Sequence, residues 1–429
     1  MTFSVHTLGC KVNSCESAAI IDAMLAAGYE RAAGTDVADI CIINSCTVTG
    51  MSVKKARQAI SGCKTGDPGR VVVLCGCFPQ AYPDEAKDTA ADIIIGNTSK
   101  ADIPFLVGEY LKNPVKRVFV NPLSRDFDER CAGVDLDRTR AFIKIEDGCD
   151  RFCTYCIIPT ARGRVRSEKL SEITRKAMLA AESGHKEIVL TGINLSCYGQ
   201  DLGLTLGDAV KAADVDGIER IRLGSLEPDM MTDSEIEKLK AVDKLCPHFH
   251  LSLQSGSDTV LVRMNRKYTT EEYAQSVDIL KKYYDAPAIT TDIIVGFPQE
   301  TEEEFSETME FAKRIGFSKI HVFKYSRRKG TVADKMSGQI EEQVKNTRSE
   351  RLMALEAALG ETYREQFLGR EEAVLFEEST VVDGEVCQVG YNERYVRIAA
   401  KTKEDLSNCI RTVKIEKKTK EQETLFAKI

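Results

Sequence analysis

Short apolar runs alternate with segments of helical periodicity over the first 120 residues of the chain. The runs expected to form strands lie at 3–8, 39–43, 71–74 and 91–95. The segments expected to form helices lie at 16–27 and 52–63. Strands that alternate with helices favour a parallel sheet that is covered on both faces. We therefore predict a doubly wound α/β domain over residues 1–120.

A second series of apolar runs follows between residues 135 and 335, and most of its members precede a helix-like segment. These runs lie at 141–145, 187–190, 218–223, 249–253, 289–295 and 319–323. Six successive β–α units predict a partial (β/α)6 barrel rather than a closed barrel. Active-site residues of such barrels lie in the loops that follow the strands. With the charged helical segment 340–367, this core is expected to span residues 135–365.

The pattern changes after Gly369, where short apolar runs are separated by turn residues such as Gly384. These runs lie at 373–376, 386–389, 395–399 and 410–415. They predict a small antiparallel β-barrel over residues 366–429. A basic stripe on its last strand and tail is either an RNA contact or a frayed, solvated terminus. The stripe consists of Arg411, Lys414, Lys417, Lys418 and Lys420.

The composition narrows the class of protein. The 429 residues are 43% hydrophobic and 29% charged, which is ordinary for a soluble protein of two or three domains. The net charge of −7 opposes bulk electrostatic binding of nucleic acid, so any RNA contact must use local patches. Without a signal-peptide pattern or an apolar run of about 20 residues, we expect a cytoplasmic protein that has no membrane contact. In that compartment the fifteen cysteines indicate metal sites or catalysis more than disulfides.

Three cysteines crowd the loop after the first core strand, with the spacing C-x3-C-x2-C. They are Cys149, Cys153 and Cys156. Three thiolates can bind three irons of a [4Fe-4S] cluster and leave the remaining iron open to a small molecule. The alternatives are three buried free cysteines or a zinc site, which would need a fourth thiolate or a histidine nearby. The crowding of the three residues in one loop favours the cluster.

Three more cysteines, Cys10, Cys46 and Cys77, directly follow successive strands of the N-terminal domain. Ligands of open parallel sheets bind at the carboxyl ends of the strands, so these distant cysteines can converge. The alternatives are three unrelated thiols, or Cys75 in place of Cys77, although Cys75 ends its strand and suits the core better. We expect a second three-cysteine cluster. We assign the remaining cysteines of this segment to packing: Cys15, Cys41 and Cys63.

The other core strands end in polar or glycine-bearing loops, which taken singly are usually turns. The candidate residues in them are Gly192, Asn194, Ser225, Glu227 and Gln254. Glu227 could equally cap a helix or pair with a surface arginine. Basic residues also follow three strands, at 162–169, 263–267 and 327–329. These basic groups are either contacts for phosphate or carboxylate or solvated faces.

The loop at 145–159 resembles the signature of the radical S-adenosylmethionine (SAM) superfamily, C-x3-C-x-aromatic-C, with Tyr155 as the aromatic residue. The resemblance implies that the open iron binds the amino and carboxylate groups of SAM. An electron from the cluster would then cleave SAM to a 5′-deoxyadenosyl radical. It also implies that Gly192 and Asn194 lie near the SAM amino group, that the 225–227 loop lies near the ribose, and that Gln254 belongs to a further SAM-contacting loop.

The segments 8–13, 44–49 and 75–80 resemble the three cysteine motifs of the radical SAM methylthiotransferases, and 264–268 is also similar to that family. The resemblance implies that Cys10, Cys46 and Cys77 bind a second [4Fe-4S] cluster, which carries or receives the sulfur of the product. It implies two SAM molecules per turnover. One methylates that sulfur, and the other yields the radical that acts at adenine C2. The domain at 366–429 resembles the TRAM domain, an RNA-binding module.

Within this family, the segments 11–13, 156–159, 190–194 and 321–326 most resemble the bacterial branch that acts on threonylcarbamoyladenosine in tRNA. The other branches act on isopentenyladenosine in tRNA or on ribosomal protein S12. A rival from another class is a non-enzymatic iron–sulfur RNA-binding redox sensor. The expected partners are tRNA bearing threonylcarbamoyladenosine and an electron donor such as flavodoxin or ferredoxin. We expect the protein to be a monomer.

Overall fold

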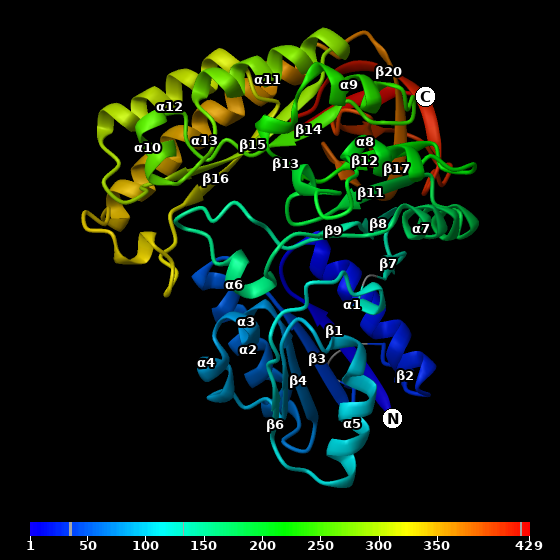
Figure 1. Cartoon of the computed structure of the whole chain (residues 1–429). Helices are drawn as coiled ribbons and strands as arrows, with labels where there is room; N and C mark the ends of the chain where they lie inside the picture. The colour runs from blue at the N-terminus through cyan, green and yellow to red at the C-terminus, as the bar shows by residue number, and fades with distance from the viewer. Residues whose placement is uncertain (34–36, 132, 421–422) are drawn as a thin grey trace.

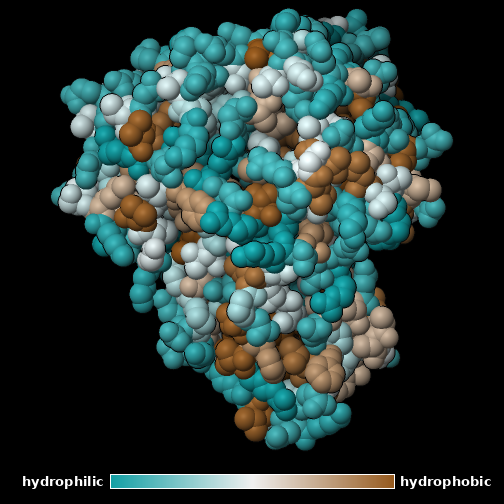
Figure 2. Space-filling model, viewed as in Figure 1, coloured by the Kyte–Doolittle hydropathy of each residue, from teal (hydrophilic) through white to brown (hydrophobic). Residues whose placement is uncertain are grey.

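The computed structural model describes residues 1–33, 37–131, 133–420 and 423–429. The N-terminal sheet lies at one end of the molecule, and the core and the C-terminal strands lie together at the other (Figure 1). Hydrophilic residues cover most of the face shown in Figure 2, and hydrophobic residues gather over its lower part, at the N-terminal sheet. Within the described residues, no helix has the length and apolar character that a membrane span requires.

The N-terminal sheet has six parallel strands in the order β2-β1-β3-β4-β5-β6. They are β1 (Thr2–Thr7), β2 (Glu30–Arg31), β3 (Ile40–Ser45), β4 (Val71–Gly76), β5 (Ile93–Ile95) and β6 (Arg117–Phe119). The helices are α1 (Lys11–Ala26), α2 (Gly50–Gly66), α3 (Cys77–Ala81), α4 (Pro83–Lys87) and α5 (Ile103–Lys112). Helices α1 and α5 pack on one face, and α2, α3 and α4 pack on the other. This arrangement confirms the expected sheet that is covered on both faces.

All six strands expected in the core are present, with ends shifted by at most two residues. They are β8 (Arg140–Lys144), β11 (Glu187–Thr191), β12 (Arg220–Leu223), β14 (His248–Leu251), β15 (Ala288–Val295) and β16 (Lys319–Lys324). They lie in two four-stranded sheets with the orders β12-β11-β8-β7 and β13-β14-β15-β16, completed by β7 (Val134–Asp135) and β13 (Ser225–Leu226). Apart from the antiparallel β7–β8 pair, both sheets are parallel.

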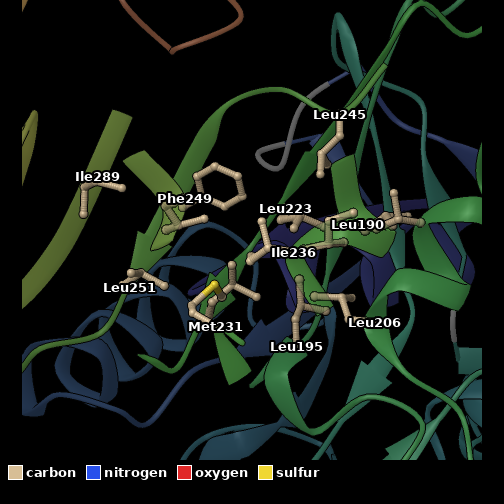
Figure 3. Close-up of a cluster of buried hydrophobic side chains, with 14 of the residues drawn as sticks. Leu190, Leu195, Leu206, Leu223, Met231, Ile236, Leu245, Phe249, Leu251 and Ile289 are labelled. Carbon is tan, nitrogen blue, oxygen red and sulfur yellow. The ribbon is translucent and has the colours of Figure 1, made fainter. Parts of the chain in front are cut away.

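One hydrophobic core joins the two sheets to their helices (Figure 3). Leu190 and Leu223 from the first sheet belong to the same buried cluster as Phe249 and Ile289 from the second. Burial of such apolar area is the main favourable contribution to folding. The core helices are α6 (Ile158–Arg162), α7 (Leu170–Glu182), α8 (Leu206–Ala212), α9 (Asp233–Lys240), α10 (Asp258–Arg263), α11 (Thr270–Tyr283), α12 (Glu302–Ile315) and α13 (Glu342–Glu365).

The C-terminal strands form a closed five-stranded barrel in the order β17-β18-β19-β21-β20. They are β17 (Glu371–Val382), β18 (Glu385–Asn392), β19 (Arg397–Ala400), β20 (Ile410–Lys418) and β21 (Thr424–Lys428). The expected small barrel is mainly antiparallel, but it has one further strand, β21, which pairs parallel to β19 and antiparallel to β20. The alternative of a frayed terminus is wrong, since residues 424–428 form this strand. The basic stripe is also partly neutralised, since Lys418 pairs with Glu361 and Glu365, and Arg411 pairs with Glu404.

Candidate active site

The cysteine loop of the core follows β9 (Glu146–Asp147) and ends at α6. Gly148 has a φ of +86°, and a Cβ atom there would lie 2.0 Å from the carbonyl oxygen of Arg164. Only glycine fits this close approach, which lets the Cys149 N–H donate to the carbonyl of Gly163. The loop therefore places Cys149 by a tight backbone contact.

Residues further along the chain fix the middle of this loop. The N–H of Thr154 donates to the carbonyl of Met264, and its hydroxyl donates to the carbonyl of Arg263 at 2.9 Å. Arg263 in turn forms a 2.7 Å ion pair with Glu304 on α12. The Tyr155 ring meets Phe297 edge-on, with centroids 6.4 Å apart. Helix α12 thus supports the loop through Arg263.

The three loop thiols lie close enough to influence one another electrostatically. Burial, together with the neighbouring Cys153, raises the pKa of Cys149 to about 11 and that of Cys156 to about 12. Arg266 Nη1 lies 3.3 Å from Cys153 Sγ, and Asn194 Nδ2 lies 3.9 Å from Cys149 Sγ. Three crowded thiols of this kind suit a cationic metal centre, which would hold them as thiolates.

Gly192 and Asn194 follow β11 directly beside this loop. The N–H of Asn194 donates to Glu146 Oε2 at 2.8 Å, and a Cβ at Gly192 would lie 2.6 Å from the same oxygen. Burial raises the pKa of Glu146 well above its usual range. Its other oxygen, Oε1, is buried without a hydrogen-bond partner among the described residues. That acceptor is a site for a cationic donor group from a ligand.

The remaining strand-end residues lie in different settings. Ser225 lines the cavity described below. Glu227 pairs with the buried Arg266, rather than with the surface arginine considered from the sequence. Gln254 has a φ of +67°, and its N–H donates to the carbonyl of Asp292. This strained backbone at a strand end is typical of residues held for function.

The second cysteine group assembles at the carboxyl edge of the N-terminal sheet. Cys10 precedes α1, Cys46 follows β3, and Cys77 begins α3. Gly9 has a φ of +116°, and a Cβ there would lie only 2.7 Å from the Cβ of Cys46. Burial raises the pKa of both Cys10 and Cys46, and the nearby Cys77 raises them further.

The other cysteines of the N-terminal sheet lie in its hydrophobic layers. Cys75 packs with the α1 side of the sheet, while Cys41 and Cys63 pack with the α2 side. Cys15 is buried on α1, where its thiol donates to the carbonyl of Phe142 at 3.3 Å. These positions agree with the packing roles expected for them.

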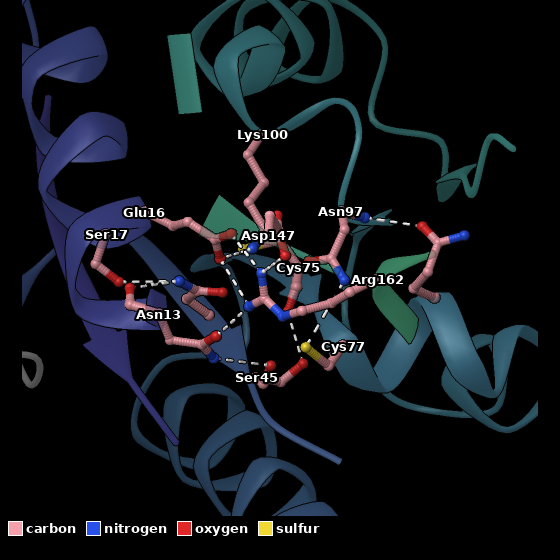
Figure 4. A network of polar contacts seen from close by, with 12 residues as sticks. Asn13, Glu16, Ser17, Ser45, Cys75, Cys77, Asn97, Lys100, Asp147 and Arg162 are labelled. Atoms are coloured by element: carbon pink, nitrogen blue, oxygen red, sulfur yellow. Dashed lines mark hydrogen bonds and ion pairs between the residues drawn. The ribbon is translucent and has the colours of Figure 1, made fainter. Parts of the chain in front are cut away.

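A buried network of charges lies beside the second cysteine group and joins α1 to the core (Figure 4). Arg162 Nη1 lies 2.7 Å from Glu16 Oε1 and 3.0 Å from Asp147 Oδ1. Lys144 also pairs with both carboxylates, at 2.9 and 2.7 Å, and Lys100 pairs with Glu16. The pKa values of both carboxyl groups are lowered by these cations, although burial opposes the shift.

Positive charge exceeds negative charge in this network. Arg166 also pairs with Asp147, at 3.2 Å, so four cations face two carboxylates. The largest electrostatic influence on Arg162 after its own burial comes from Cys77, and Arg162 lowers the pKa of Cys10. The surplus charge therefore favours thiolates at the second cysteine group.

The basic residues that the sequence marked as candidate anion contacts are largely occupied by carboxylates. In addition to Arg162 and Arg166, Arg263 pairs with Glu304, and Arg327 pairs with Asp334. The alternative of a merely solvated face is also wrong for Arg162, which is 1% exposed. Its partner Glu16 lies on a distant segment, so this pairing could not be predicted from the sequence pattern.

A cavity of about 630 Å³ lies between the second cysteine group, the core strands and the C-terminal barrel. Cys10, Gly192 and Ser225 line it together. The sequence pattern indicated no site role for the other polar residues of the cavity, chiefly Lys11 and a trio formed by His250, Asp292 and His321. An available signal was Asp292, a charged residue inside the apolar run 289–295.

Comparisons with known proteins define the class first. Residues 143–312 match the Radical SAM superfamily model, and residues 2–96 match a model described as uncharacterized protein family UPF0004. Solved radical SAM structures share the fold. TsrM from Kitasatospora setae has a TM-score of 0.56 at 14% identity over 75% of this chain and 72% of that one. OxsB has a TM-score of 0.54 at 12% identity over 95% and 65%. The chain is a radical SAM enzyme.

Relatives that match nearly the whole chain are more specific. The Threonylcarbamoyladenosine tRNA methylthiotransferase MtaB of Bacillus subtilis is 41% identical over 96% of this chain and 93% of its own length. The protein of the same name from Aquifex aeolicus is 38% identical over 92% and 98%. The tRNA-2-methylthio-N(6)-dimethylallyladenosine synthase of Clostridium tetani is 36% identical over 88% and 85%. This chain belongs to the radical SAM methylthiotransferase family.

Proposed function

We propose that the protein is a tRNA threonylcarbamoyladenosine methylthiotransferase, which inserts a methylthio group at C2 of the modified adenosine next to the anticodon. The observation that carries the proposal is one cavity bordered by Cys10 on one side and by Gly192 and Ser225 on the other. The cavity supports the proposal because a sulfur site at Cys10 and a SAM site at Gly192 and Ser225 would share one space. The relatives named for threonylcarbamoyladenosine support the choice of branch.

The residues present fit two [4Fe-4S] clusters and SAM. Cys149, Cys153 and Cys156 would hold one cluster, because a metal centre would stabilise as thiolates the crowded thiols whose pKa values burial raises at Cys149 and Cys156. Glu146 lies beside Gly192, and its buried Oε1, which has no hydrogen-bond partner among the described residues, suits the amino group of SAM. When bound, this cluster supplies the electron that cleaves SAM to the 5′-deoxyadenosyl radical. The SAM side of the site would be shaped by Tyr155, Asn194, Ser225, Glu227 and Gln254.

The second cluster would be held by Cys10, Cys46 and Cys77, with Cys77 preferred over the core residue Cys75. The surplus positive charge of the Arg162 network supports this assignment, since it offsets three thiolates. The two four-stranded sheets would form the partial (β/α)6 barrel, and the five-stranded barrel would be a TRAM domain that contacts the tRNA. The proposed protein is a monomer that receives electrons from flavodoxin or ferredoxin.

The test is mass spectrometry of tRNA nucleosides from a strain lacking the gene, with and without complementation. We expect the methylthio form of threonylcarbamoyladenosine to disappear and return. Loss of methylthio-isopentenyladenosine instead would support the other tRNA branch. If all tRNA nucleosides are unchanged, the RNA substrate is wrong, and the aspartate of ribosomal protein S12 becomes the substrate to assay.

A further inference from the structure

The cavity beside Cys10 contains a positive charge that the protein does not neutralise. Within the part of the chain that the structure describes, Lys11 has no carboxylate or hydrogen-bond partner, and its ammonium lies 5.9 Å from the centre of the Phe142 ring. Two other cations of the cavity are paired. Arg222 lies 2.7 Å from Glu187, and Lys319 lies 3.2 Å from Glu356. Lys11 is therefore available to an anionic ligand.

The surroundings of Lys11 are polar, and they include the charged groups Arg222 and Glu187 as well as the histidines of the cavity. The positive charge of Lys11 contributes to the lowered pKa values of His248 and His321, so its ammonium acts on both imidazoles. His250 Nε2 lies 3.5 Å from Asp292 Oδ1, while its Nδ1 lies 3.0 Å from the Thr290 hydroxyl. These groups offer hydrogen-bond donors and acceptors beside the unpaired cation.

A metal ion is the other ligand that this trio could hold. The donor atoms of His250, Asp292 and His321 lie within 4.8 Å of one another. However, the charges of Lys11 and Lys319 both act on the imidazole of His321 and would repel a dication. An anion with further polar atoms fits the charge of the cavity better.

We propose that Lys11 determines substrate specificity by binding the carboxylate of the threonylcarbamoyl group, while the trio faces the polar atoms of the same group. This inference rests on the proposed tRNA substrate and names the residue that reads it. The threonylcarbamoyl group carries a carboxylate, a hydroxyl and a urea, whereas an isopentenyl group carries only hydrocarbon. A cavity of about 630 Å³ falls within the roughly 300–1,000 Å³ of small-molecule sites. An unpaired ammonium there would penalise the hydrocarbon group and favour the acid.

The experiment compares two anticodon stem-loops, one with threonylcarbamoyladenosine and one with its neutral threoninamide counterpart. With the wild-type protein, we expect kcat/KM for the acid to exceed that for the amide by about 10–100-fold, as for a hydrogen bond to a charged group. Lys11→Gln should reduce this preference below about threefold, mainly by raising KM for the acid. Lys11→Arg should keep a preference for the acid. Lys313→Gln, which removes an exposed lysine on α12, should match the wild type.

Several outcomes would overturn the inference. Equal use of the acid and amide stem-loops by the wild-type protein would overturn it. This outcome needs no variant, so it can be measured even if Lys11→Gln fails to assemble its iron sites. The inference would also be overturned if Lys11→Gln keeps the preference for the acid. The same holds if this variant raises KM for SAM rather than KM for the stem-loop. Stoichiometric non-iron metal that is lost in His321→Phe would assign the trio to a metal instead. If the wild type does not modify the acid stem-loop at all, it is the proposed substrate that fails.

Discussion

The two cysteine groups reach similar arrangements by opposite routes. The loop group consists of Cys149, Cys153 and Cys156. It lies in one loop, and local backbone contacts place it. The sheet group consists of Cys10, Cys46 and Cys77. Its members come from three strand ends, and the parallel sheet brings them together. In both groups, a glycine of positive φ immediately precedes the first cysteine. A site encoded in one loop is visible as a motif, whereas a site assembled by a sheet is visible only through its topology.

The electrostatic settings of the two groups also differ. Near the loop group, Arg266 contacts Cys153 but is itself paired with Glu227. Beside the sheet group, four buried cations share two carboxylates, which leaves a positive surplus near Cys77. The sheet group should therefore hold its thiolates with more help from the protein than the loop group does.

The largest expected effect separates the two groups by function. Cys153→Ala should abolish SAM cleavage, by more than about 100-fold, because even changes behind a metal ligand cost roughly 10–100-fold. Cys46→Ala should leave SAM cleavage in place and stop formation of the methylthio product. Chromatography of 5′-deoxyadenosine, with mass spectrometry of the tRNA, measures both.

Cys75→Ala is the control for this pair, because Cys75 is buried in the hydrophobic core of the sheet. We expect it to retain both activities, whereas Cys77→Ala should lose the methylthio product. If Cys46→Ala still makes that product, the assignment of the second cluster is wrong.

The next effect tests the electrostatic difference between the groups. Arg162→Gln would leave Glu16 and Asp147 buried with fewer cations and should cost about 3–5 kcal/mol of stability, as for a broken buried ion pair. The pKa values of both carboxyl groups are lowered in the folded protein. The ion pairs therefore stabilise the fold above the unfolded pKa values of about 4, and this stabilisation is lost as the pH falls through the folded pKa values. Urea unfolding of the anaerobic wild-type and variant proteins at a series of pH values measures this difference in the free energy of unfolding.

Arg164→Gln is the matched control, since Arg164 forms an exposed 3.0 Å pair with Asp150 and its guanidinium lies 4.6 Å from the centre of the Phe152 ring. It should change stability by less than about 1 kcal/mol. Iron and spectroscopic analysis should show that Arg162→Gln weakens the sheet group before the loop group. Equal effects of the two arginine variants would refute a special role for the buried network.

Sequence patterns predicted the parts of this molecule that depend on neighbours along the chain. The core strands and the loop at 149–156 are of this kind, because periodicity and spacing are local properties. The sequence could not predict that Arg162 meets Glu16, 146 positions away. Strand β21 was missed because the short connection from its antiparallel neighbour β20, residues 419–423, contains no glycine, proline, asparagine or aspartate as a turn signal. Segment 11–13 indicated a family branch, but it could not show that Lys11 lacks a partner among the described residues, because that is a property of the cavity.

The smallest expected effect tests the support that only the loop group receives. Arg263 and Thr259 lower the pKa of Glu304 to about 2, so this carboxylate stabilises the fold above its unfolded pKa of about 4.3 and loses that effect as pH falls toward 2. Glu304→Gln should therefore cost about 1 kcal/mol near neutral pH, a figure reduced for its partial exposure, and progressively less in acid. Because Arg263 carries the Thr154 contact, iron retention by the loop group should fall slightly, while the sheet group is unaffected. Glu310→Gln, an exposed residue on the same helix, is the control in urea titrations across pH. A cost for Glu304→Gln that stays constant down to pH of about 3 would show that the carboxylate charge is not what supports the loop.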